Sequence, residues 1–191
     1  MRLLTLIFLT LWPLCLLAGD PPEVILKALP EKIAGCQRDD IHPYDKVELG
    51  ASAAYKTVGL LVTVYIYDLG HQNIGEALSD PILREAFESA QSELKEADHS
   101  GFYTGLEERD SGTANFGPGH QVLRARYRLT RVKGENAGQR FFSEIHVFGA
   151  KGNIVKLRIS GSLANETEHA KTIEQFIPAL MDSLQAGGGK K

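Results

Sequence analysis

Few residues of this chain have the types and spacing that covalent catalysis needs. Residues 50–54 (GASAA) approach the G-x-S-x-G pattern that exposes a nucleophilic serine, but Ala54 stands where the second glycine belongs. Ser52 also leads into an expected hairpin, whereas that pattern needs a strand, a turn and a helix. Cys36 and His42 are six residues apart, which places them about 20 Å from each other along one strand. We therefore expect no catalytic residue, and we interpret Cys36 as a small buried hydrophobe.

The sequence also gives no pattern for a metal or a cofactor. Six histidines are scattered without an HExxH or CxxC partner. Asp39, Asp40 and His42 form the densest cluster of potential ligands, and three such residues in a polar segment are typical of a solvated turn. Residues 117–119 (GPG) lack the third glycine of a dinucleotide fingerprint and precede an expected strand rather than a helix. We expect neither a bound metal nor a cofactor.

Cationic side chains on the expected strands form the one constellation with a binding chemistry. The strand His120–Val132 alternates arginines with apolar residues, and Asn153–Ser160 alternates in the same way. If the aliphatic sets of these strands and of Arg140–Phe148 all face the helices, the cations share one open sheet face. The candidate binding residues are Arg124, Arg126, Arg128, Lys156, Arg158 and His146.

This face has two interpretations, which the sequence leaves open. In the first it is a solvated face, with Glu144 pairing across strands to the arginines for about 0.2–1 kcal/mol each. In the second it is a shallow basic surface, edged by Phe142 and Phe148, that binds the carboxylate or phosphate of an anionic partner.

The elements that position these residues follow from periodicity. A short helix is expected over Val24–Leu29, and a weak strand over Ile33–Tyr44. The hairpin Ser52–Thr57 with Leu60–Asp68 turns at Val58-Gly59. Long helices are expected over Asp80–Ala97, with Asp80 as the cap, and over Asn165–Leu184. Phe102–Glu107 is expected to add a strand, followed by an irregular loop through Ser111-Gly112. The chain is thus expected to form one α+β domain, an antiparallel sheet of about five to seven strands packed against two main helices.

The first 19 residues indicate where the protein works. Arg2, an apolar run to Leu17 and the small residues Ala18 and Gly19 have the layout of a secretory signal peptide. The alternative is an uncleaved anchor, but the apolar run is shorter than the roughly 20 residues of a spanning helix. We expect a signal peptide at 1–19 cleaved near Ala18 or Gly19, one domain over 20–185 and a flexible tail at 186–191. The protein is then periplasmic or secreted, with no stable membrane anchor.

Net charge restricts the class of partner, and cysteine content restricts how the domain can be stabilised. The formal net charge of −3 argues against nucleic acid, which needs a basic footprint. Cleavage removes Cys15 and leaves Cys36 alone, so no internal disulfide can stabilise the domain.

The order of two strands, a helix, three strands and a helix is similar to the PsbP-like α/β domain. The segment AAYKTVGLLVTVYIYDLG followed by DPILREAFESAQSEL also resembles a group of uncharacterised exported bacterial proteins. The PsbP-like fold is known from an extrinsic photosystem II protein and from small bacterial periplasmic proteins. The resemblance implies a fold and a compartment, and it brings no catalytic residues.

Three classes of function remain. The first is a non-enzymatic binding or assembly protein of the bacterial envelope, with an unknown protein or anionic ligand as its partner. The second is a hydrolase with an unrecognised site, and the third is a structural subunit of an envelope complex. A map of surface charge would separate the first from the third, and a deep pocket lined by histidine and carboxylates would favour the second.

Overall fold

The computed structural model describes residues 20–134 and 137–186. The helices are α1 (Pro22–Ala28), α2 (Pro81–His99) and α3 (Glu166–Ala186), with the short 3-10 turns η1 (Val47–Leu49) and η2 (Leu163–Asn165). The strands are β1 (Lys32–Ile33), β2 (Cys36–Pro43), β3 (Ala51–Thr57), β4 (Leu60–Tyr67), β5 (Tyr103–Asn115), β6 (Gln121–Arg131), β7 (Arg140–Ala150) and β8 (Asn153–Ser162).

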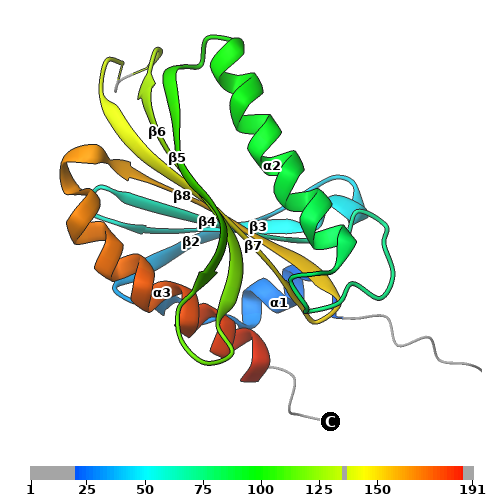
Figure 1. Cartoon of the computed structure of the whole chain (residues 1–191). Coiled ribbons are helices and arrows are strands. Elements are labelled where there is room, and N and C mark those ends of the chain that lie inside the picture. Colours follow the sequence, from blue (N-terminus) through cyan, green and yellow to red (C-terminus); the bar gives the residue numbers. More distant parts are fainter. Residues whose placement is uncertain (1–19, 135–136, 187–191) are drawn as a thin grey trace, which may run out of the picture.

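The eight strands form one sheet in the order β1-β2-β3-β4-β8-β7-β6-β5, and every neighbouring pair is antiparallel. Figure 1 shows the strongly twisted sheet between α2 and α3, with the long β5-β6 pair at one edge. The chain returns from β5 through β8 by successive hairpins and places β8 beside β4.

Helices cover both faces of the sheet. On one face, α1 and α3 pack on β3, β4 and β8 through a core that includes Leu26, Val62 and Phe176. On the other face, α2 packs on β5, β6 and β7 through a core that includes Leu83 and Ile145. Each face is therefore apolar over a different set of strands, and polar side chains lie beside each core.

The best-patterned elements form as expected. In β4, Leu60, Val62, Val64 and Ile66 are buried under α3, and the alternate residues face α2. Asp80 caps α2 by accepting a hydrogen bond from the Ile82 amide at 2.8 Å, and Pro81 occupies the first helical position, where no amide donor is needed.

Three expectations about the fold need correction. The segment expected as one strand at Ile33–Tyr44 is two strands, because Ala34 and Gly35 both have positive φ and turn the chain between β1 and β2. The expected loop through Ser111-Gly112 is part of β5, which pairs with β6 as far as Asn115. The sheet therefore has eight strands rather than five to seven, and it packs against three helices rather than two.

The expected signal peptide at 1–19, with Trp12 and Cys15, lies outside the described residues, as does most of the expected tail. Within the part of the chain that is described, no helix is long and apolar enough to cross a membrane.

Candidate functional site

The cations expected on one open sheet face lie on two opposite faces. Arg124, Arg126 and Arg128 face α3, because they pair across β6 and β7 with His146, Glu144 and Phe142. The next hairpin places His146 opposite Leu157 and Val147 opposite Lys156, so Lys156 and Arg158 face α2. The expectation of a single basic face is wrong, since the aliphatic sets of β6 and β8 point to different helices.

Arg124, Arg126 and Arg128 of β6 are held in ion pairs. Arg126 donates from Nε to Asp110 Oδ2 of β5 at 2.8 Å, and Arg124 also reaches this carboxylate. Arg128 donates to Glu166 Oε2, in the first turn of α3, at 2.7 Å. The hydrogen bond from Arg126 lowers the pKa of the Asp110 carboxyl. Most of the positive charge of these three arginines is therefore compensated within the molecule. Their ion pairs connect β6 to β5 and to α3.

His146 is not placed to meet a surface partner. Its side chain is fully buried, and its Nε2 lies 2.8 Å from a carboxylate oxygen of Glu144. The ring of Phe116 packs against it at a centroid distance of 5.9 Å. We therefore remove His146 from the candidate binding residues.

The rejected catalytic candidates are also accounted for. Ser52 is buried and shares a hydrogen bond of 3.2 Å with the hydroxyl of Tyr44, so it is not presented as a nucleophile. Cys36 is fully buried, which confirms its interpretation as a core residue, and burial raises the pKa of its thiol. Among the described residues, no three His, Cys, Asp or Glu side chains are close enough to hold a metal ion.

Two adjoining hollows, which share Tyr65 and Glu93 in their linings, run along α2, and we call them together the α2 groove. One wall is the helix face formed by Ala86, Ser89, Glu93 and Ala97, whose spacings of three and four residues align them. The sheet supplies the alternate residues of two neighbouring strands. These are Leu61, Thr63, Tyr65 and Tyr67 from β4, and Lys156, Arg158 and Ser160 from β8.

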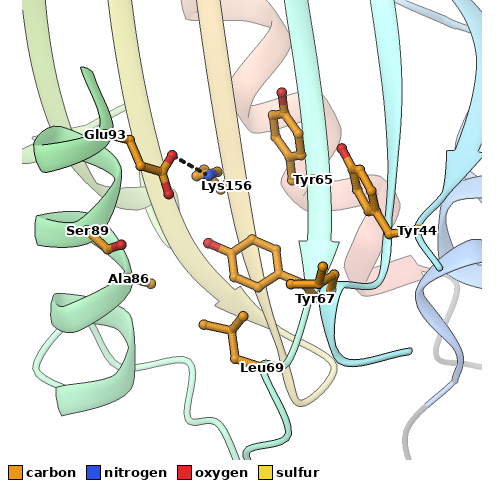
Figure 2. A pocket seen from close by; sticks show the side chains of 9 residues that line it. Tyr44, Tyr65, Tyr67, Leu69, Ala86, Ser89, Glu93 and Lys156 are labelled. Carbon is orange, nitrogen blue, oxygen red and sulfur yellow. Dashed lines mark hydrogen bonds and ion pairs between the residues drawn. The ribbon is translucent and has the colours of Figure 1, made fainter. Parts of the chain in front are cut away.

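One end of the groove is a hollow of about 280 Å³ lined by aromatic rings. Figure 2 shows Tyr44, Tyr65 and Tyr67 around this hollow, with Lys156 between the sheet and Glu93 of α2. Lys156 Nζ lies 3.4 Å from Glu93 Oε2, and 5.0 and 5.7 Å from the ring centroids of Tyr65 and Tyr67. Burial, and then the negative charge of Glu93, raise the pKa of the Tyr67 phenol.

The other end is more basic. Around a hollow of about 380 Å³, Arg158 donates from Nε to Ser143 Oγ at 3.2 Å, and the Arg131 guanidinium lies 5.0 Å from the ring centroid of Phe141. A smaller hollow continues this end, with Lys133 stacked over Phe102. None of the ion pairs found among residues 20–134 and 137–186 includes Arg158, Arg131 or Lys133. This end of the groove therefore offers guanidinium groups to an anion.

Sequence reasoning identified Lys156 and Arg158 but missed Arg131 and the tyrosines. The signal for the tyrosines was present, because Leu61, Thr63, Tyr65 and Tyr67 form the larger, partly polar set of β4. Only the pairing of β4 with β8 shows that this set and the two cations share one face.

Comparison with known proteins finds a solved structure that is similar at low sequence identity. No family model and no curated protein matches the chain. The solution structure of cyanobacterial PsbP (CyanoP) from Synechocystis sp. PCC 6803 is similar, at 12% sequence identity and a TM-score of 0.45. The match covers 78% of this chain and 92% of that chain.

Proposed function

We propose that the protein is an exported, non-enzymatic binding or assembly protein of the bacterial envelope, which takes an anionic partner in the α2 groove. One observation carries this proposal: Arg158 and Arg131 line the same hollow, and neither forms an ion pair with a carboxylate among the described residues. Aromatic side chains and the exposed Leu61 line this hollow beside them. Guanidinium groups in such a setting suit a carboxylate or phosphate, which they bind through two parallel hydrogen bonds.

Arg124, Arg126 and Arg128, which face α3, are weaker candidates for this role. Asp110 and Glu166 already form ion pairs with these arginines, so a partner would have to displace an internal carboxylate. A hydrolase is also less well supported, since Ser52 is buried and Cys36 is enclosed in the core.

A photo-cross-linking amino acid in place of Leu61 tests the site in the native cells. Leu61 lies in the groove and is 37% exposed, whereas Val24, on α1, is 52% exposed and serves as the matched control position. We expect adducts from position 61 that fall several-fold when Arg158 and Arg131 are both replaced by Gln. Equal adducts from both positions, or adducts that do not respond to the replacements, would contradict the proposal.

The compartment is tested by mass spectrometry of the exported protein. We expect a mature chain that starts at Gly19 or Asp20 and therefore lacks Trp12, the single tryptophan. Recovery of the intact Met1 form from the membrane fraction would instead favour the uncleaved anchor.

A further inference from the structure

We propose that the occupant of the α2 groove is an extended polypeptide segment, with an apolar side chain in the tyrosine end and an acidic side chain about four residues away at the arginine end. This inference rests on the proposed function and specifies its partner. It follows from the length of the groove, its exposed apolar side chains and the uneven distribution of charge along it.

The groove has the length of a short extended peptide. Along its helical wall, Ala86 to Ala97 spans about 16 Å at 1.5 Å per residue. Along its strand wall, Tyr67 to Leu61 spans about 20 Å at roughly 3.3 Å per residue. An extended segment of about five or six residues covers this distance.

Exposed apolar side chains accompany the groove from end to end. Eight large apolar residues of the described chain are exposed, and four of them line these hollows. Leu49 and Leu69 are 42% and 46% exposed at the tyrosine end, Leu61 is 37% exposed at the arginine end, and Phe102 is 58% exposed in the smaller hollow that continues this end. Apolar surface concentrated in this way marks an interaction site, and it fits the alternating apolar side chains of a polypeptide.

The charges set the direction and the spacing. Lys156 is neutralised by Glu93 at the tyrosine end, which leaves that end suited to an apolar side chain. Arg158 pairs across the strands with Thr63, four residues from Tyr67 along β4. That separation is about 13 Å, or four residues of an extended peptide, whose side chains i and i+4 point to the same side.

Two other anionic polymers fit the lining less well. A uronic-acid polysaccharide presents many hydroxyl donors, and the one carboxylate side chain lining these hollows, Glu93, is already engaged by Lys156, which leaves hydroxyl oxygens as the other side-chain acceptors. Single-stranded nucleic acid would stack on the rings, but it prefers a basic groove, whereas this chain has a net charge of −3.

The test begins with a display library of random peptides of about ten residues, selected on the purified protein. We expect enriched peptides with a large apolar residue and an Asp or Glu four positions apart, in one orientation. The best peptide, labelled with a fluorophore, is then measured against the wild type and against Arg158→Gln with Arg131→Gln. The matched control is Lys27→Gln with Lys56→Gln, which changes the net charge equally at exposed sites outside the groove.

The groove variant is expected to weaken binding at least tenfold, and the control variant less than twofold. Replacing the acidic residue of the peptide by Gln is expected to weaken its binding to the wild type by the same factor. The same replacement is expected to cause no further loss of affinity for the groove variant, and this non-additivity identifies the contact. Leu69→Ser, at an exposed position, is expected to weaken selection of the apolar residue without affecting thermal unfolding.

A library without enrichment over bare resin overturns the peptide proposal, as does a peptide whose binding ignores the groove variant. The same assay with an oligogalacturonate and with an oligothymidylate separates this failure from that of the proposed function. If either of these binds and depends on Arg158 and Arg131, the groove is an anion site and the peptide inference is wrong. If none of the three binds but the cross-link at position 61 persists, the peptide inference is again wrong.

Discussion

Lys156 of β8 and Tyr65 of β4 are directly opposite each other, and the Lys156 ammonium lies 5.0 Å from the centroid of the Tyr65 ring. The same ammonium lies 5.7 Å from the Tyr67 ring and 3.4 Å from the Glu93 carboxylate. Lys156 thus joins the sheet to α2 at the tyrosine end of the groove, while its side chain is only 18% exposed.

Replacing Lys156 by Met should lower the free energy of unfolding by about 1 kcal/mol. Met retains the apolar stem, but the ammonium's interaction with the rings, worth about 0.5–1 kcal/mol at exposed sites, is lost together with the ion pair. Urea unfolding measures this, and Lys56→Met, at a solvent-exposed ion pair, is the matched control. An equal effect of the two substitutions would show that the aromatic contacts of Lys156 contribute nothing.

Replacing Arg124, Arg126 and Arg128 together by Ser should destabilise the fold by about 1–3 kcal/mol. Their partners on β5 and α3 would lose their counter-ions, and Arg128 and Glu166 are each only about one-third exposed. Thermal and urea unfolding measure the loss. A triple variant with unchanged stability and lost partner binding would restore these residues as the binding surface.

The division of these cations between two faces shows how far the sequence could predict the site. The alternation along β6 correctly placed Arg124, Arg126 and Arg128 on the face of Glu144 and His146. The error lay in β8, where a pairing shifted by one residue reverses which face every side chain occupies.

The link between β7 and β8 already contained the missing information. Lys151 and Gly152 both have positive φ and form a two-residue turn, so Ala150 pairs with Asn153. Even-numbered residues of β7 then share a face with odd-numbered residues of β8, which separates Lys156 from His146. In contrast, the position of α2 beside β4 depends on long-range packing, so no local signal predicts the groove that they form.

Replacing Asp110 by Asn should reduce stability at pH 7 and also reduce its loss in acid. The Arg126 hydrogen bond lowers the pKa of Asp110 from 3.8, so this carboxylate stabilises the fold above about pH 4. That contribution disappears as the pH falls through the lowered pKa. Urea unfolding at pH 7 and pH 2 should therefore show a difference between variant and wild type that is smaller at pH 2. A difference that is undiminished in acid would assign the effect to packing.

Replacing Cys36 by Ser should cost about 1–3 kcal/mol, because a hydroxyl would be buried at a site with no solvent exposure. Cys36→Ala is the control for lost volume alone. A thiol reagent should modify Cys36 only as fast as the protein unfolds. Rapid modification of the native protein would contradict the enclosed position of this thiol.

Replacing Tyr67 by Phe should make the protein more resistant to alkaline unfolding. Burial and the Glu93 carboxylate raise the pKa of the Tyr67 phenol above 10.0, so the folded state retains this proton where the unfolded state releases it. The stability contributed by the neutral phenol is complete below about pH 10 and is lost as the pH rises towards the raised pKa. Phenylalanine has no proton to release, so the difference in unfolding free energy between pH 8 and pH 11 should be smaller in the variant. Tyr44→Phe is the matched control in the same hollow. An equal alkaline loss in wild type and Tyr67→Phe would place the decisive ionisation at another of the six tyrosines.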